Sequence, residues 1–226
     1  AGELSAGALL TPQGKILFDF LVSRHGDGFL LDCREDIAAD FAKRLRFYRL
    51  RARVDIEAQE QALVAVSWQN DSSAGGLKDA RFGEDAPVLR TYGTAASGNE
   101  DDYARLRIEN GVAEGGGDYA FSDVFPHDVN LDQTGGVSFA KGCYVGQEVV
   151  SRMQHRGTAR RRVLIAHGGS ALEAGAPVTA GGRLIGTLGS ALEGKALALV
   201  RIDKVKDAMD SDLEILAGGV EIRLSI

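Results

Sequence analysis

Short apolar runs separated by turn residues begin the chain and predict a β-rich protein. Apolar stretches at 7–10, 16–22 and 29–31 are divided by a Pro-Gln-Gly turn at 12–14 and by a glycine-containing segment at 25–28. Runs of this length between such breakers are typical of strands joined by tight turns. We therefore expect the first thirty or so residues to form a system of hairpins.

Helical spacing appears in three places. Ile37, Phe41, Leu45 and Tyr48 follow one another every three or four residues, which predicts a helix beginning near Asp36. Shorter helices are expected at 101–109 and 146–153. Further strands are expected at 88–92 and in a second hairpin, formed by 54–57 with 63–68.

The pattern changes in the second half of the chain. Residues 111–142 show little periodicity and predict a long loop, which in a compact region is usually functional or poorly ordered. After Gly157 only short apolar runs separated by glycine turns remain, at 162–166, 178–180, 183–185, 195–201 and 220–224. This pattern is typical of a small barrel or sandwich. We predict an α+β fold with an α+β region over 1–157 and a C-terminal β-barrel over 158–226.

Composition narrows the class of protein. The chain has 226 residues, 44% of them hydrophobic, with 29 glycines and 4 prolines, as expected for a turn-rich globular protein. Its net charge of −6 argues against general nucleic-acid binding. No apolar run approaches the roughly 18 residues of a membrane-spanning helix, so no membrane partner is expected.

The two cysteines, Cys33 and Cys143, cannot form a disulfide framework and favour a reducing compartment. Neither belongs to a C-x-x-C pair, so no metal site and no stably held iron–sulfur cluster is predicted. The sequence starts at Ala1 without a methionine. We expect the natural N-terminus to lie upstream, which leaves targeting signals undetermined.

The stretch Lys141-Gly142-Cys143-Tyr144-Val145-Gly146-Gln147-Glu148 has the composition of a reactive site. A cysteine between a lysine and a helix N-terminus lies in positive potential, which stabilises the thiolate. The glycines would let backbone N–H groups approach an anion or a flat ring. A cysteine packed in a tight turn is the alternative interpretation, since free cysteine is commonly buried.

Charged residues supply three further candidates. Five arginines lie close together, and arginine binds carboxylate or phosphate through two parallel hydrogen bonds; they are Arg152, Arg156, Arg160, Arg161 and Arg162. A solvated surface cluster is the alternative. Asp19 interrupts an apolar strand, where a carboxylate either faces a cleft or alternates onto the wet face. Asp128 is either a functional carboxylate or an ordinary loop acid.

These segments resemble a known family. The stretch 141–148 resembles the signature of the YgfZ family, folate-binding proteins tied to iron–sulfur enzyme maintenance and related to the glycine-cleavage T-protein, an aminomethyltransferase. Weaker similarities agree along nearly the whole chain from about residue 8, at Leu10–Ile16, Asp79–Arg81, Arg107–Gly111 and Gly181–Ser190. Alanine replaces the family's proline at position 80, and the family's opening segment is absent.

The resemblance implies a multi-lobed ring around a central folate cleft, with tetrahydrofolate as the cofactor. It places Asp19 near the reactive nitrogens of folate and Asp128 on the pterin edge, and Tyr144 is assigned to the same cofactor. It assigns Cys143 and Lys141 to the chemistry, with Asp19. Arg152, Arg160 and Arg162 would hold the glutamate tail, including that of polyglutamylated folate.

Three functions remain open at this point. The first is a tetrahydrofolate-binding factor for assembly or repair of iron–sulfur enzymes, with Cys143 as nucleophile or transient ligand and iron–sulfur proteins or assembly factors as partners. The second is a folate-dependent one-carbon transferase of the aminomethyltransferase kind. The third is a non-catalytic scaffold that docks an acidic protein. The sequence does not establish turnover. A cytoplasmic location is expected, or the mitochondrial matrix in a eukaryote.

Overall fold

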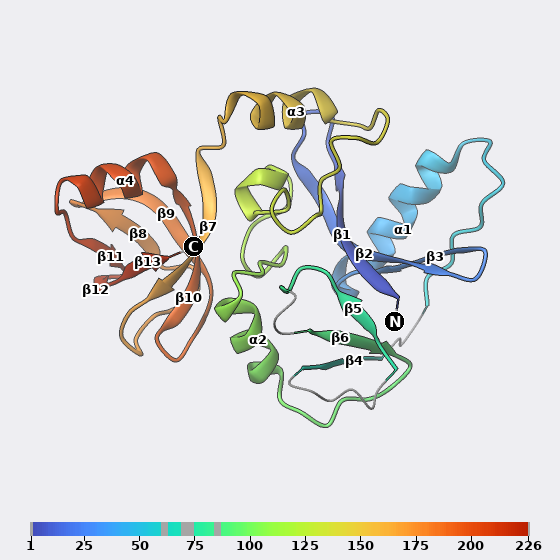
Figure 1. Ribbon diagram of the computed structural model, residues 1–226, viewed down its shortest axis with the longest axis horizontal. Helices are drawn as coiled ribbons and strands as arrows, with labels where there is room; N and C mark the ends of the chain where they lie inside the picture. The colour runs from blue at the N-terminus through green and yellow to red at the C-terminus, as the bar shows by residue number, and fades with distance from the viewer. Residues whose placement is uncertain (1, 60–62, 69–74, 84–86, 226) are drawn as a thin grey trace. The chain divides into compact units, whose positions relative to one another are not determined.

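The computed structural model describes residues 2–59, 63–68, 75–83 and 87–225 and divides into two compact units. The first unit comprises residues 1–8 and 18–97, and the second comprises 9–17 and 98–226. Both contain helices and strands (Figure 1), so the predicted α+β class is confirmed. None of the helices within these ranges is long and apolar enough to cross a membrane.

A six-stranded sheet with the order β3-β2-β1-β5-β6-β4 forms the first unit. Strands β1 and β5 run parallel, whereas β2–β3, β5–β6 and β4–β6 are antiparallel pairs. The predicted first hairpin is present, since Leu21 to His25 pair with Gly28 to Asp32. The strands are β1 (Glu3–Leu10), β2 (Ile16–His25), β3 (Gly28–Asp32), β4 (Val64–Ser67), β5 (Leu77–Asp79) and β6 (Leu89–Tyr92).

Helix α1 (Glu35–Arg49) forms where the apolar spacing predicts it. It buries Phe41 and Ala42. The Phe41 ring lies 5.2 Å from the Phe18 ring and 5.0 Å from the Phe20 ring, centre to centre, so the helix packs on an aromatic cluster from β2. The first turn of α1 is acidic and its last turn is basic, and both charges interact favourably with the helix macrodipole.

The predicted second hairpin is wrong. Strand β4 pairs with β6, and residues 54–57 form no strand. The carbonyl oxygens of Val54 and Ile56 instead accept hydrogen bonds from Arg49 and Arg46 of α1. An apolar run shows strand propensity but not its partner, and here side chains of α1 take the place of a neighbouring strand.

The first half of the second unit holds α2 (Glu100–Glu109), the short 3₁₀ helix η1 (Pro126–Val129) and α3 (Gln147–Arg156). The Asn99 side chain caps α2 by accepting from the N–H of Asp101 at 3.0 Å. The predicted loop at 111–142 is tied to β2, because the N–H of Ile16 donates to the Val124 carbonyl at 2.9 Å. Much of this loop is therefore ordered structure without strand or helix periodicity.

The C-terminal barrel is confirmed. Its sheet has seven strands in the order β12-β11-β8-β9-β10-β7-β13, and its two edge strands are separated in sequence by Ile222 alone. A sheet whose edges are joined by one residue must curl almost completely into a barrel. The strands are β7 (Arg161–His167), β8 (Pro177–Ala180), β9 (Arg183–Leu192), β10 (Lys195–Arg201), β11 (Ile215–Ala217), β12 (Val220–Glu221) and β13 (Arg223–Ser225).

Helix α4 (Ile202–Asp210) was not expected from the sequence. It follows β10 without a break and contributes Val205 and Ala208 to the barrel core (Figure 1). The spacing of Ile202, Val205 and Ala208 carries the helical signal, which a pattern of short strands on both sides masks.

Candidate functional site

The cysteine motif is anchored by a close contact between two glycines of the second unit. Gly146 has a φ of +82°, and a β-carbon built on it would lie 2.7 Å from the Cα of Gly14 and 2.8 Å from the Thr11 carbonyl oxygen. Gly14 also has a φ of +82°. From the sequence we expected the motif glycines to let a ligand approach the backbone. In the structure, Gly146 lets the start of α3 pack against the turn at 11–14.

Cys143 is exposed on the loop that leads into α3. Around it, the N–H of Lys141 donates to the Ser138 hydroxyl at 3.2 Å, and the N–H of Tyr144 donates to the Gln147 side chain at 3.3 Å. The Lys141 ammonium lies 4.9 Å from the centre of the Tyr144 ring, a cation–π contact. The alternative of a buried, packed cysteine is thereby excluded, and the thiol is accessible.

The Tyr144 hydroxyl is buried and has no hydrogen-bond partner among the described residues. Burial raises the pKa of this phenol. An unpaired buried hydroxyl carries a free-energy penalty that a bound water or ligand group would remove. Tyr144 therefore has an unused donor within the motif.

Asp128 is buried within η1 and is held by two donors. Its Oδ2 accepts from Arg161 at 2.9 Å and from the N–H of Phe125 at 3.0 Å. Arg161 also donates to the carboxylate and carbonyl oxygen of Asp123, at 2.9 and 2.8 Å. The Lys15 ammonium donates to the same carbonyl at 2.6 Å and lies 5.2 Å from the centre of the Phe125 ring. These five side chains form the Asp123–Asp128 cluster.

The ion pairs of this cluster shift the pKa values of Asp123 and Arg161. The hydrogen bond from Arg161 lowers the pKa of Asp123 against the opposing effect of burial. Burial alone would lower the pKa of Arg161, but Asp123 and Asp128 outweigh it and the pKa rises. Neither Asp123 nor Lys15 was expected at a site from the sequence, because nothing in the linear pattern brings residue 15 next to residue 123.

The five-arginine cluster separates into two groups. Arg161 belongs to the Asp123–Asp128 cluster, and Arg162 is bound by Asp132, at 2.9 Å from Nη2 to Oδ2, and by the His127 carbonyl at 2.7 Å. Arg152, Arg156 and Arg160 are exposed and form no ion pair with any described residue. Only these three are free to bind an anion.

His127 is 1% exposed, and its Nε2 lies 3.2 Å from the Gln154 side-chain oxygen. Its Nδ1 has no partner among the described residues. No motif in the sequence marks this histidine, because its burial next to Asp128 depends on the fold and not on the linear pattern.

Asp19 lies in β2 of the first unit and is half-buried. Its charge reaches Cys33, whose pKa is raised to about 11 by burial first and then by Asp32, Asp19 and Asp36. Cys33 is therefore a poor nucleophile at neutral pH. This half-buried environment is that of a structural cysteine.

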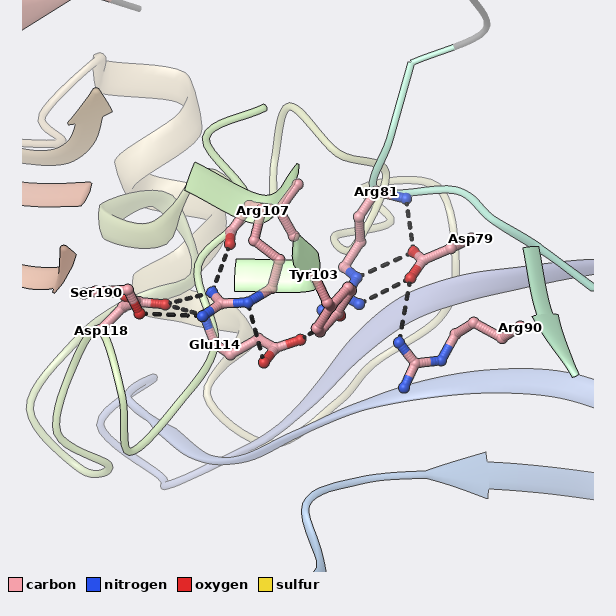
Figure 2. A network of polar contacts seen from close by, with 9 residues as sticks. Asp79, Arg81, Arg90, Tyr103, Arg107, Glu114, Asp118 and Ser190 are labelled. Atoms are coloured by element: carbon pink, nitrogen blue, oxygen red, sulfur yellow. Dashed lines mark hydrogen bonds and ion pairs between the residues drawn. The ribbon is translucent and has the colours of Figure 1, made fainter. Parts of the chain in front are cut away.

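Three of the weaker family-like segments, Asp79–Arg81, Arg107–Gly111 and Gly181–Ser190, contribute residues to buried ion-pair networks. In the second unit Arg107 donates to Asp118 at 2.8 Å and to the Ser190 hydroxyl at 3.0 Å, while Tyr103 donates to Glu114 at 2.8 Å (Figure 2). Burial alone would lower the pKa of Arg107, but Glu114 and Asp118 raise it. This network ties α2 to barrel strand β9, so Arg107 and Ser190 are structural.

A separate network lies in the first unit. Asp79 is fully buried and accepts two side-chain hydrogen bonds from Arg81, at 3.0 and 2.7 Å (Figure 2). Arg90 lies 3.7 Å from the same carboxylate and donates to Asp32 at 2.8 Å. The Asp-Ala-Arg segment thus holds the neighbouring strands β5 and β6 together within the sheet. Within the described ranges no group of three His, Cys, Asp or Glu side chains is placed to hold a metal ion.

Comparison with known proteins supports the barrel assignment. Residues 160–226 match the family model described as the CAF17 C-terminal β-barrel domain. This range coincides with β7 to β13.

A solved structure extends the similarity over the chain. The glycine cleavage system aminomethyltransferase T from Bartonella henselae superposes on 99% of this chain and 74% of its own, with a TM-score of 0.73 and 17% identity. The fold is that of the T-protein. At this level of identity the likeness concerns the fold alone.

Curated relatives carry a different name. The chain is 30% identical over 231 residues to the human iron–sulfur cluster assembly factor IBA57, mitochondrial, covering 87% of this chain and 64% of that protein. It is also 30% identical over 190 residues to the IBA57 homolog of Chaetomium globosum, covering 70% and 43%. The chain thus spans about two fifths to two thirds of these relatives. These relatives are named IBA57 proteins, so the YgfZ family expected from the cysteine motif is a related family and not the one that the comparisons name.

Proposed function

We propose that this protein supports the assembly or repair of iron–sulfur enzymes, with Cys143 as nucleophile or transient cluster ligand. The observation that carries the proposal is the exposed thiol on a loop whose far end is fixed by the contact of Gly146 with Gly14. Similarity to proteins named iron–sulfur cluster assembly factors supports it. One thiolate cannot hold a cluster, so an iron–sulfur protein or assembly factor supplies the other ligands.

In this proposal Lys141 contributes a positive charge near the Cys143 thiol. Its ammonium lies over the Tyr144 ring, which keeps a positive charge on the loop that carries Cys143. Arg152 and Arg156, further along α3, add to the positive potential on the same helix.

Tetrahydrofolate is the cofactor that we propose, and the residues fit it in part. The unpaired Tyr144 hydroxyl and the free guanidinium groups of Arg152 and Arg160 are available to a pterin and to a glutamate tail. Asp128 and Arg162 are already paired with Arg161 and Asp132, so a ligand would have to share these side chains with their partners or displace the partners. The part of Asp19 in binding folate stays a prediction.

A folate-dependent one-carbon transferase is the second candidate, favoured by the T-protein fold. In it Asp19 would hold or move a proton at the reactive nitrogen of folate. Aminomethyl transfer needs no thiol, so the exposed Cys143 distinguishes the two candidates. A scaffold that only docks an acidic protein would need neither folate nor the thiol.

The location follows the first candidate. The relatives compared are named mitochondrial proteins, which gives no support to a cytoplasmic location. For a eukaryotic source we propose the mitochondrial matrix.

Complementation tests the first candidate. In cells that lack their own homologue, the unmodified chain should restore the activity of a [4Fe–4S] enzyme, and Cys143→Ser should not. Cys33→Ser is the matched control and should restore it, because Cys33 is a poor nucleophile. Full rescue by Cys143→Ser would move the assignment to the transferase or the scaffold.

Calorimetric titration with tetrahydrofolate tests the cofactor. Saturable binding is expected, weakened by Asp128→Ala if the pterin displaces Arg161. Arg160→Ala with Arg162→Ala should weaken the polyglutamylated form more than the monoglutamate. No binding at all would favour the scaffold.

A further inference from the structure

The end of α1 and the residues after it carry a dense set of cations. Residues 43–54 contain one lysine, five arginines and no acid, in a chain whose net charge is −6. Like charges three or four residues apart on a helix destabilise it. A local excess of this size is therefore an energetic cost to the free protein and indicates an anionic partner.

Large apolar side chains are exposed in the same segment. Phe47 is 71% exposed, Leu50 84% and Val54 54%, and Tyr48 lies with its ring at 5.7 Å from that of Phe47. Leu50 has a φ of +48°, which is unusual for a branched side chain. Exposed apolar side chains grouped in this way mark a site of interaction.

Two of the arginines organise this surface. Arg46 donates to the Ile56 carbonyl at 3.0 and 3.3 Å, and Arg49 donates to the Val54 carbonyl at 3.3 Å. These bonds hold the segment after α1 against the last turn of the helix. The remaining cations are exposed and form no ion pair with any described residue; they are Lys43, Arg44, Arg51 and Arg53. Together with Phe47, Tyr48, Leu50 and Val54 they form the α1-end surface.

Cations and apolar side chains alternate on this surface. Lys43 and Arg44 lie one helical turn before Phe47, and Arg51 follows Leu50 directly. The core of a protein–protein interface is depleted of charged residues other than arginine, and its rim is polar. Lysine and arginine side chains beside exposed phenylalanine and leucine side chains are typical of segments lying in a lipid interface, where the apolar side chains enter the acyl boundary and the cations reach the headgroups.

We propose that the α1-end surface binds the surface of an anionic lipid bilayer. Phe47 and Leu50 enter the interface, and the four free cations pair with lipid phosphates. The sequence predicted no membrane partner because no apolar run is long enough to span one, but a peripheral contact needs no such run. The inference is independent of the proposed function, since it uses no residue of the motif.

Vesicle co-sedimentation of the chain tests the inference. The chain should bind vesicles of equal parts phosphatidylglycerol and phosphatidylcholine, and should not bind pure phosphatidylcholine. Binding should weaken as salt is raised, because screening shortens the reach of the charges. No binding to the mixed vesicles would overturn the proposal and assign the surface to an acidic protein.

Variants locate the contact. Arg51→Gln with Arg53→Gln should weaken binding by about 25-fold, taking about fivefold for each charge near an anionic surface. Arg156→Gln with Arg183→Gln removes two exposed cations of the second unit and should leave binding within about twofold. Equal losses in the two pairs would overturn the assignment to this surface. Phe47→Ser with Leu50→Ser should abolish binding, with the circular dichroism spectrum and thermal midpoint unchanged.

Discussion

Gly146 lies so close to Gly14 that a β-carbon on Gly146 would stand 2.7 Å from the Cα of Gly14. Real side chains do not make contacts this short with backbone atoms. Position 146 of the cysteine motif thus requires a glycine, because its backbone touches the backbone of the turn at 11–14. The position of the Cys143 loop depends on that contact.

Gly146→Ala should therefore destabilise the protein. Overpacking alone costs about 1–3 kcal/mol, and the φ of +82° adds strain for any L side chain. Urea denaturation measures the loss. Gly142→Ala is the matched control, because a β-carbon there meets nothing within 4 Å, and it should change stability by less than about 0.5 kcal/mol. Equal effects of the two substitutions would contradict the contact.

Asp118→Ala should cost about 3–5 kcal/mol, because it leaves the buried Arg107 without its principal partner. It also removes the acceptor for the Ser190 N–H, which donates to Asp118 at 2.7 Å. The thermal midpoint reports the loss. Asp207→Ala, which breaks an exposed pair with Lys204, should cost at most about 1 kcal/mol. A small effect at Asp118 would mean that the network relaxes around a water.

The two cysteines should differ in alkylation. Iodoacetamide at pH 8 should modify the exposed Cys143 and spare Cys33, whose pKa is raised to about 11. The raised pKa also means that Cys33 stabilises the fold below the thiol's ordinary pKa of about 8.5, and this is lost as the pH rises towards 11.

Asp19→Asn should lower the pKa of Cys33 and speed its alkylation, since Asp19 contributes to the raised value. Site-resolved mass spectrometry across pH measures both thiols at once. Modification of Cys33 at the rate of Cys143 in the folded chain would contradict its assigned environment.

Tyr144→Phe should leave the free protein as stable or raise its stability by up to about 1 kcal/mol, because the buried hydroxyl has no described partner. If tetrahydrofolate pairs with that hydroxyl, the same variant should bind it more weakly. Denaturation with and without the folate separates the two effects. A loss of stability without folate would indicate a bound water in the pocket of the hydroxyl.

Acid should loosen the Asp123–Asp128 cluster. The pKa of Asp123 is lowered in the fold, so its contribution is present above the unfolded carboxyl pKa of about 3.9 and is lost as the pH falls through the lowered value. Arg161→Gln should raise the pKa of Asp123 towards that of a free carboxyl. Carboxyl chemical shifts followed from pH 6 downward measure it, and an unchanged titration would contradict the pairing.

Local patterns predicted the elements better than their partners. The stripe of Ile37, Phe41 and Leu45 predicted α1, and the C-terminal runs predicted the barrel, because both signals lie within a few residues. The pairing of β4 with β6 and the helix α4 were missed, since the first depends on distant segments and the second is masked by strands on either side.

The candidate site shows the same division. The motif predicted that Cys143 lies on a loop before a helix, because a glycine followed by an amphipathic run is a local signal for the start of a helix. It could not place Arg161 on Asp128 or Arg162 on Asp132, because these ion pairs join the loop after α2 to the first barrel strand. Of the five arginines that are clustered in the sequence, two are therefore paired with aspartates in the structure and three form no ion pair with a described residue.

The closure of the barrel constrains how the chain is made. Strand β7 pairs with β13, and Ile165 faces Ser225, sixty positions later in the chain. At a synthesis rate of about 5–20 residues per second, β7 waits several seconds for the strand that seals it. During that interval its open edge is a template for other strands. This topology therefore requires that the exposed edge of β7 be protected from other strands while the rest of the chain is synthesised.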